Sequence, residues 1–168
     1  MQGKGRLWFG CVLLLVAMLS ITACMHWFTA APVPTLIIGP VTLLGGGTRG
    51  EILLSVTDMP GGGLASVAAN VLTGIQYPIA NVANISVVGL AGFEVLAQQF
   101  IGGVGGFFVA HAVTGLPAGD FVKLVFDVID PSVTLADFTF DQASIDLGDD
   151  NNQDVAYQIR DAFKYYAK

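Results

Sequence analysis

The feature that most restricts the fold is a series of short apolar runs separated by glycine-rich segments, which begins at residue 36. Three glycines follow the first run at 45–47, and Pro-Gly-Gly-Gly follows the second run at 60–63. Strand-length runs with a turn signal about every 8–12 residues are typical of an all-β sandwich or barrel. No segment of helical length with a 3.6-residue period lies between the runs, so parallel β-α-β units are not expected. The expected strands lie within residues 36–44, 51–57, 64–72, 85–90, 93–100, 106–113, 121–129 and 133–147.

The run at 121–128 shows most clearly how such a strand divides its side chains. Leu124 and Phe126 fall on one face, whereas Phe121 and Lys123 fall on the other. Successive side chains of a strand point to opposite faces, so we expect the first face in the core and the charged positions of the second in solvent.

The first 24 residues predict export. Lys4 and Arg6 precede an uncharged apolar run, which ends in Leu-Ser-Ile-Thr-Ala-Cys at Cys24. A basic start, an apolar centre and small residues before a cleavage site are typical of a secretory signal peptide, here residues 1–23. A cysteine directly after Ile-Thr-Ala resembles the lipobox of bacterial lipoproteins. That resemblance implies that Cys24 becomes the first mature residue and carries the lipid.

Two alternatives for the N-terminus stay open. Residues 7–31 contain no Asp, Glu, Lys or Arg, and this length exceeds the ~20 residues that a membrane-spanning helix needs. The segment is therefore also a candidate for an uncleaved anchor, and ordinary cleavage without lipid is the other alternative. All three interpretations place the rest of the chain outside the cytoplasm, because Lys4 and Arg6 hold the N-terminus inside. Residues 24–34 are expected to form an extended tether.

The charge of the exported part argues against nucleic acid as a partner. Without residues 1–23, the chain keeps 13 acidic and five basic side chains, a formal charge of −8. Binding to a phosphate backbone needs clustered Lys and Arg, which this composition lacks. The remaining 145 residues have the size of one domain.

Catalytic chemistry has little support in the sequence. The only two histidines are His26, near the N-terminal segment, and His111, in an apolar run. A single histidine within a strand is more often structural than catalytic. The two cysteines, Cys11 and Cys24, cannot form a zinc site or a disulfide within the mature domain. We therefore predict a protein that is not an enzyme, although spacing alone does not exclude paired carboxylates.

An acidic segment near the C-terminus predicts a possible calcium site, since oxygen ligands suit this hard cation. One register uses Asp150, Asn152, Asp154 and Asp161 as positions 1, 3, 5 and 12 of an EF-hand-like loop. Position 6 is then Val155, where the loop needs glycine for a sharp turn. A looser site would use Asp146 with Asp149 and Asp150, and a solvated acidic turn is the alternative to both. The candidate calcium ligands are Asp146, Asp149, Asp150, Asn152 and Asp154.

The last residues predict a short amphipathic helix at 151–168. Val155, Ile159, Ala162, Phe163 and Tyr166 recur at helical spacing on one side. Asn152 or Asp154 could cap its start, and the late lysines suit its end.

From about Leu36 to Asp154, most of the exported chain, the order of features resembles that of cohesin modules: a leading strand comes first, and four later segments resemble motifs of the family. They are Gly-Leu-Ala-Ser at 63–66, the glycine-led strand at 105–110, the Gly-to-Val run at 119–128 and the acidic, Asn-containing turn at 143–151. The resemblance implies a jelly-roll β-sandwich related to carbohydrate-binding modules, and an interaction module at the cell surface. The chain departs from the cellulosomal setting, because it shows a single module and no Thr/Pro-rich linker. No dockerin-contacting residue of the family can be placed on this sequence, so the partner-binding residues are left unassigned.

Pattern and resemblance together predict an all-β, antiparallel jelly-roll-type β-sandwich of about eight or nine strands at 35–150. An N-terminal apolar signal or anchor helix precedes it, and the short C-terminal helix follows it. The leading hypothesis is a membrane-anchored, extracytoplasmic interaction module, periplasmic, on the cell surface or extracellular. It would bind a protein partner, or the machinery of a cell-surface or extracellular polysaccharide. Its membrane contact would be lipid on Cys24 or the N-terminal helix.

Two alternative functions stay open. A structural subunit of a membrane complex or filament, with a retained helix, is one alternative. A carbohydrate-binding module is the other, although Trp8 and Trp27 both lie outside the expected sandwich and Tyr77 is the only tyrosine within it.

Overall fold

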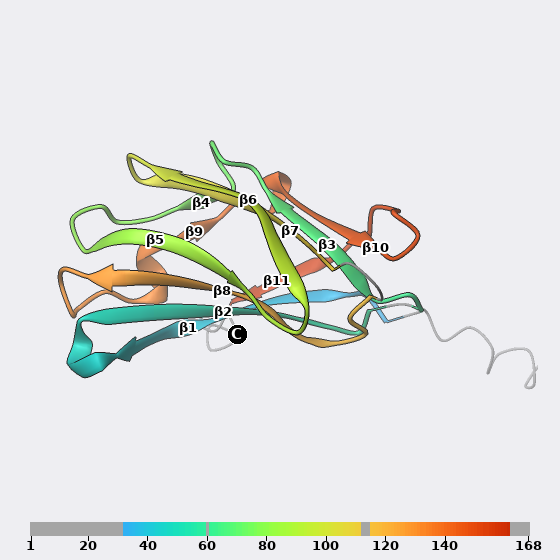
Figure 1. The fold of residues 1–168 in the computed structure, drawn as a ribbon, viewed down its shortest axis with the longest axis horizontal. Coiled ribbons are helices and arrows are strands. Elements are labelled where there is room, and N and C mark those ends of the chain that lie inside the picture. Colours follow the sequence, from blue (N-terminus) through green and yellow to red (C-terminus); the bar gives the residue numbers. More distant parts are fainter. Residues whose placement is uncertain (1–31, 60, 112–114, 162–168) are drawn as a thin grey trace, which may run out of the picture. The chain divides into compact units, whose positions relative to one another are not determined.

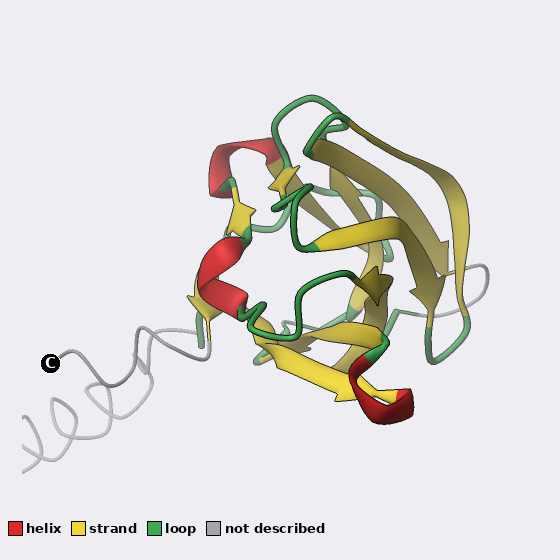
Figure 2. Ribbon diagram, turned by 90° about the vertical axis from the view of Figure 1, so that its left-hand side faces the viewer, coloured by secondary structure: helices red, strands yellow, loops and turns green. Residues whose placement is uncertain are grey.

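Eleven strands and no α-helix make up the part of the chain that the computed structural model describes, residues 32–59, 61–111 and 115–161. Three 3-10 helices, Gly45–Gly47, Leu135–Asp137 and Gln142–Ser144, lie in connections between strands (Figure 2). The strands are β1 (Thr35–Leu44), β2 (Arg49–Thr57), β3 (Leu64–Ala69), β4 (Ile75–Gln76), β5 (Val82–Gly89), β6 (Phe93–Ile101), β7 (Val104–His111), β8 (Gly119–Val128), β9 (Thr139–Phe140), β10 (Ile145–Asp149) and β11 (Gln158–Asp161).

The strands form two sheets, which lie as two layers in Figure 1. The first, called the β2 sheet here, has the order β11-β1-β2-β8-β5. The second, called the β7 sheet, follows the path β10-β3-β7-β4-β9, and β6 pairs with the other edge of β7. Every pairing is antiparallel except that of β1 with β11. The prediction of an all-β sandwich is therefore confirmed. The strand number exceeds the expected eight or nine, because of the two-residue strands β4 and β9 and because of β11.

The core lies between the two sheets and is entirely apolar among the described residues. In β8, Leu124 and Phe126 are buried, as the alternation predicts, whereas Lys123 on the opposite face is partly exposed. Phe121 shares the face of Lys123 in the sequence pattern but is fully buried. The physical reason is a β-bulge: the register between β2 and β8 shifts at Leu54, and an extra residue in one strand redirects the side chains beside it. The Phe121 ring then lies 5.7 Å from the ring of Phe93.

The prediction of a C-terminal helix at 151–168 is wrong for its described part. Residues 158–161 form β11, which extends the β2 sheet by pairing in parallel with the start of β1. Val155, Tyr157 and Ile159 pack against the core, whereas the residues between them are exposed. Val155 and Ile159 fit a period of two as well as a helical spacing. A short helix is marginal by itself, whereas pairing with the open edge of β1 fixes this segment as a strand. Residues 162–168 lie outside the described part.

The predicted signal or anchor segment at 1–23, together with Cys24 and most of the 24–34 tether, also lies outside the described residues. Within residues 32–59, 61–111 and 115–161, no helix is long and apolar enough to cross a membrane.

Candidate protein-binding face

The outward side of the β7 sheet is the candidate functional surface. Strand alternation turns Val67, Phe107 and Leu147 into the core, so the residues between them point away from it. The β7 sheet contributes four neighbouring strands to this surface, β10, β3, β7 and β6. We call it the β7 face. Its residues are Ser66, Ala68, Glu94, Ala97, Phe108, Ala110, Asp146 and Gly148.

The strand register arranges these side chains in two rows. The first row crosses the sheet as Asp146, Ala68, Phe108 and Ala97. Phe108 is 39% exposed and stands between two alanines, so its ring rises above its neighbours. The second row contains only small side chains and one acid, in the order Gly148, Ser66, Ala110 and Glu94.

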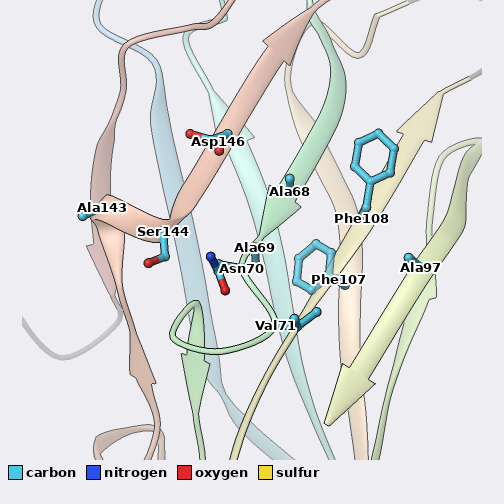
Figure 3. Close-up of a pocket in the computed structure, with 10 residues that line it drawn as sticks. All are labelled: Ala68, Ala69, Asn70, Val71, Ala97, Phe107, Phe108, Ala143, Ser144 and Asp146. Carbon is cyan, nitrogen blue, oxygen red and sulfur yellow. The ribbon is translucent and has the colours of Figure 1, made fainter.

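A pocket with a volume of about 470 Å³ lies along the first row. In the upper part of Figure 3, the lining residues Asp146 on β10, Ala68 on β3 and Phe108 on β7 lie on neighbouring strands. Its lining is mixed, with apolar side chains and a few polar groups, which is the usual character of a recognition site. The lining residues are Ala68, Ala69, Asn70, Val71, Ala97, Phe107, Phe108, Ala143, Ser144 and Asp146.

Hydrogen bonds fix the end of the pocket between the β3–β4 turn and the start of β10. The amide of Asn70 donates to the carbonyl oxygen of Ser144 over 2.9 Å. The Asn70 side-chain oxygen accepts from the amide of Leu72, and the hydroxyls of Thr73 and Ser144 lie 2.6 Å apart. The Ser144 hydroxyl also donates to the carboxylate of Asp141. The polar end of the pocket is therefore held by contacts within the protein, which keeps its shape preorganised.

The structure separates the side chains that the sequence suggested for calcium. Asp146 belongs to the β7 face. One Asp149 carboxylate oxygen accepts hydrogen bonds from the amides of Asn151 and Gln153, both at 2.9 Å, and so closes its own turn. The Asp150 carboxylate lies against Gly62 in the β2–β3 connection.

The other members of the acidic turn have backbone roles. Asn152 has a φ of 59°, a left-handed conformation that asparagine tolerates well, and Asp154 forms a single β-bridge with Gly148. In the described part of the chain, no three His, Cys, Asp or Glu residues gather as a group that could hold a metal ion. The side chain of Asp161 is outside that part. Calcium binding stays a prediction from the sequence.

His111 has structural surroundings. Its Nε2 lies 3.0 Å from the carbonyl oxygen of Ala91, and its ring meets the Phe93 ring edge-on at 5.4 Å. These contacts join the end of β7 to the β5–β6 turn and to the first residue of β6. Tyr77, the aromatic residue considered for sugar stacking, is half-buried and packs edge-on against Phe100. Neither residue belongs to the β7 face.

Phe108 is the surface residue that sequence reasoning missed. The signal was present: Phe107 and Phe108 are adjacent in one strand, and alternation forces one of two neighbouring rings to point outward. An outward aromatic ring between small residues is a candidate contact for a partner, because aromatic residues are enriched at protein interfaces.

Comparison with known proteins identifies the fold. No protein-family model matches the sequence, and no curated protein matches it. Among solved structures, the chain is similar to the sixth cohesin of scaffoldin B from Acetivibrio cellulolyticus, solved in complex with a mutant Cel5 dockerin. The TM-score is 0.54 at 11% identity, over 75% of this chain and 94% of that one.

Two further similarities are a non-cellulosomal cohesin from the archaeon Archaeoglobus fulgidus and a cohesin module from a family 33 glycoside hydrolase of Clostridium perfringens. The first has a TM-score of 0.45 at 14% identity, over 81% of this chain and 96% of that one. The second has a TM-score of 0.45 at 11% identity, over 79% of this chain and 99% of that one. The similarity to the Acetivibrio cellulolyticus module confirms the predicted resemblance at the level of the fold: the chain has the fold of a cohesin module.

Proposed function

We propose that this protein is an exported interaction module that binds a protein partner through the β7 face. The observation that carries the proposal is Phe108, an exposed ring in the middle of a row of small side chains. Small side chains let a partner approach the sheet closely, and a central aromatic residue is the kind of group that dominates binding energy at interfaces. The similarity to a cohesin solved with a dockerin supports a protein rather than a glycan as the partner.

A photo-crosslinking experiment tests the face. Full-length protein carrying p-benzoylphenylalanine in place of Phe108 is irradiated in cells of the source organism, and the adducts are identified by mass spectrometry. The matched control carries the same group at Leu53, which is exposed to a similar extent (37%) on β2 of the other sheet. We expect a discrete protein adduct from position 108 and none from position 53. Equal adducts from both positions, or adducts from position 53 alone, would contradict the proposal.

The affinity of the purified partner then measures the contribution of the ring. Phe108→Ala should weaken binding by about 30-fold or more, because an aromatic hot spot contributes at least about 2 kcal/mol. Leu53→Ala should leave the affinity unchanged. A different result would favour carbohydrate binding. In that case no protein adduct forms, and a glycan binds the full-length protein but binds Phe108→Ala more weakly.

Membrane attachment at the N-terminus is part of the same proposal. We propose that lipid on Cys24 holds the module at the membrane, with a retained N-terminal helix as the competing arrangement. The intact mass of the membrane-extracted protein distinguishes them. A mass equal to residues 24–168 plus acyl and diacylglycerol groups is the expected result. A mass equal to residues 1–168 would overturn lipidation and favour a subunit anchored through its own helix.

A further inference from the structure

Charges divide unequally between the two sheets. The three described basic residues, Arg49, Lys123 and Arg160, all lie on strands of the β2 sheet. Within the described residues, the strands of the β7 sheet carry no Lys or Arg, and their charged side chains are Glu94, Asp146 and Asp149. Lys123 is also paired with Glu51 over 3.1 Å on its own sheet. The β7 face is therefore an acidic surface with no basic strand residue to compensate it, and it attracts positive charge.

The first row of the β7 face places an acid and a ring on either side of a small residue. Asp146 on β10 and Phe108 on β7 both neighbour Ala68 on β3. Neighbouring strands lie about 4.8 Å apart, so the Cα atoms of Asp146 and Phe108 are separated by about 10 Å. Ala68, with its small side chain, lies between them in the row, and all three residues line the pocket (Figure 3).

A guanidinium group matches this arrangement better than other cations do. It is planar, so it can stack on an aromatic face while its fork of N–H groups binds a carboxylate. The apolar lining at Ala68, Val71 and Ala97 suits the methylene groups of an arginine stem. An ammonium group lacks the flat face, and a calcium ion would need several oxygen ligands where the row supplies one carboxylate.

We propose that the pocket on the β7 face receives an arginine side chain of the protein partner, which stacks on Phe108 and pairs with Asp146. This inference rests on the proposed function, since the arginine belongs to the partner. It adds the chemistry that selects the partner: a segment with an exposed arginine in a neutral or basic surrounding. Glu94, at the opposite end of the neighbouring row, favours a second positive charge on the same segment.

A titration followed by NMR tests the inference without knowledge of the partner. Isotope-labelled full-length protein in detergent micelles is titrated with N-acetyl-arginine amide, with the lysine analogue and with the uncharged citrulline analogue. We expect arginine to shift the backbone signals of Asp146, Ala68 and Phe108 most strongly, lysine to shift them less and citrulline to leave them unchanged. Equal shifts with citrulline, or shifts concentrated on the 149–154 turn, would overturn it.

Two isosteric variants test the ion pair. Asp146→Asn keeps the size of the side chain and should weaken arginine binding at least about tenfold, since a charge-assisted hydrogen bond contributes about 1.5–3 kcal/mol. The control is Asp120→Asn, an exposed acid on β8 of the other sheet, which should bind arginine as the unaltered protein does. Thermal unfolding of both variants should match the unaltered protein, because both side chains lie at the surface.

The partner obtained by crosslinking separates this inference from the function on which it rests. If Phe108→Ala weakens partner binding and Asp146→Asn does not, the arginine inference fails while the proposed function stands. If neither variant weakens binding, the β7 face is not the interface and both fail. Loss of affinity with both variants, together with retention in Asp120→Asn, supports both.

Discussion

Gly106 shows how one absent side chain allows two strands to meet beside the pocket. A Cβ atom at this position would lie 2.1 Å from the carbonyl oxygen of Ala69, and the next nearest atoms belong to the backbone of Asn70. Backbone atoms cannot rotate away as the end of a side chain can, so only glycine fits here without displacing β3 from β7. The closeness of these strands in turn brings Asn70 into the pocket lining.

Gly106→Ala is therefore expected to lower the free energy of unfolding by about 1–3 kcal/mol, the usual cost of overpacking. The measurement is a denaturant titration of the full-length protein. Gly61→Ala is the matched control, because a Cβ atom there meets nothing within 4 Å and the residue has no positive φ. Equal stability of Gly106→Ala and Gly61→Ala would show that the strands have room to separate.

At the scale of the element, β11 shows why a helix was expected and why a strand forms. The apolar residues of this segment fit both periods, and nothing within the segment decides between them. A strand forms because the edge of β1, which is far away in the sequence, pairs with Gln158–Asp161.

Tyr157 adds a second contact that local patterning does not reveal. Its hydroxyl donates to the carbonyl oxygens of Ile145 at 2.6 Å and Gln142 at 3.2 Å, and so ties the start of β11 to β10.

Tyr157→Phe should lower the free energy of unfolding at neutral pH by about 1–2 kcal/mol, because the carbonyl oxygen of Ile145, a buried residue, loses its hydrogen-bond donor. Tyr77→Phe is the control, since the described contact of that ring is its edge-on packing with Phe100, which the variant keeps. Chemical unfolding of both variants gives the comparison.

The same tyrosine predicts a dependence of stability on alkaline pH. Burial, followed by the negative charges of Asp146 and Asp141, raises the pKa of Tyr157 to about 12. The unfolded chain therefore loses this proton near pH 10, while the folded chain still holds it, so stability falls as pH rises from 10 towards 12. Below pH 10 both states are protonated and the contribution is fully present. The fall should be shallower in Tyr157→Phe, and identical slopes would contradict the assignment.

At the scale of the whole molecule, periodicity and turn chemistry were sufficient for the fold class but not for the surface. Period-two runs and glycine-rich turns specify two layers of strands around an apolar core, and the cohesin fold agrees with that prediction. The β7 face depends instead on register, which brings Asp146, Ala68 and Phe108 together from three strands. Register between distant strands cannot be read from any one of them. The calcium prediction used acids close in sequence, which the fold directs to different neighbours.

The parallel pairing of β11 has a mechanical consequence. The first residues of β1 have a neighbouring strand on both sides, with Thr35–Ile38 held by β2 on one edge and by β11 on the other. Inter-strand hydrogen bonds run roughly across the strand direction. A force applied to the chain before Thr35 and directed along β1 would load these hydrogen bonds in shear. The bonds to β2 and to β11 would then have to break together, and not one after another. We therefore expect the domain to resist mechanical unfolding when tension is applied through the chain that precedes Thr35.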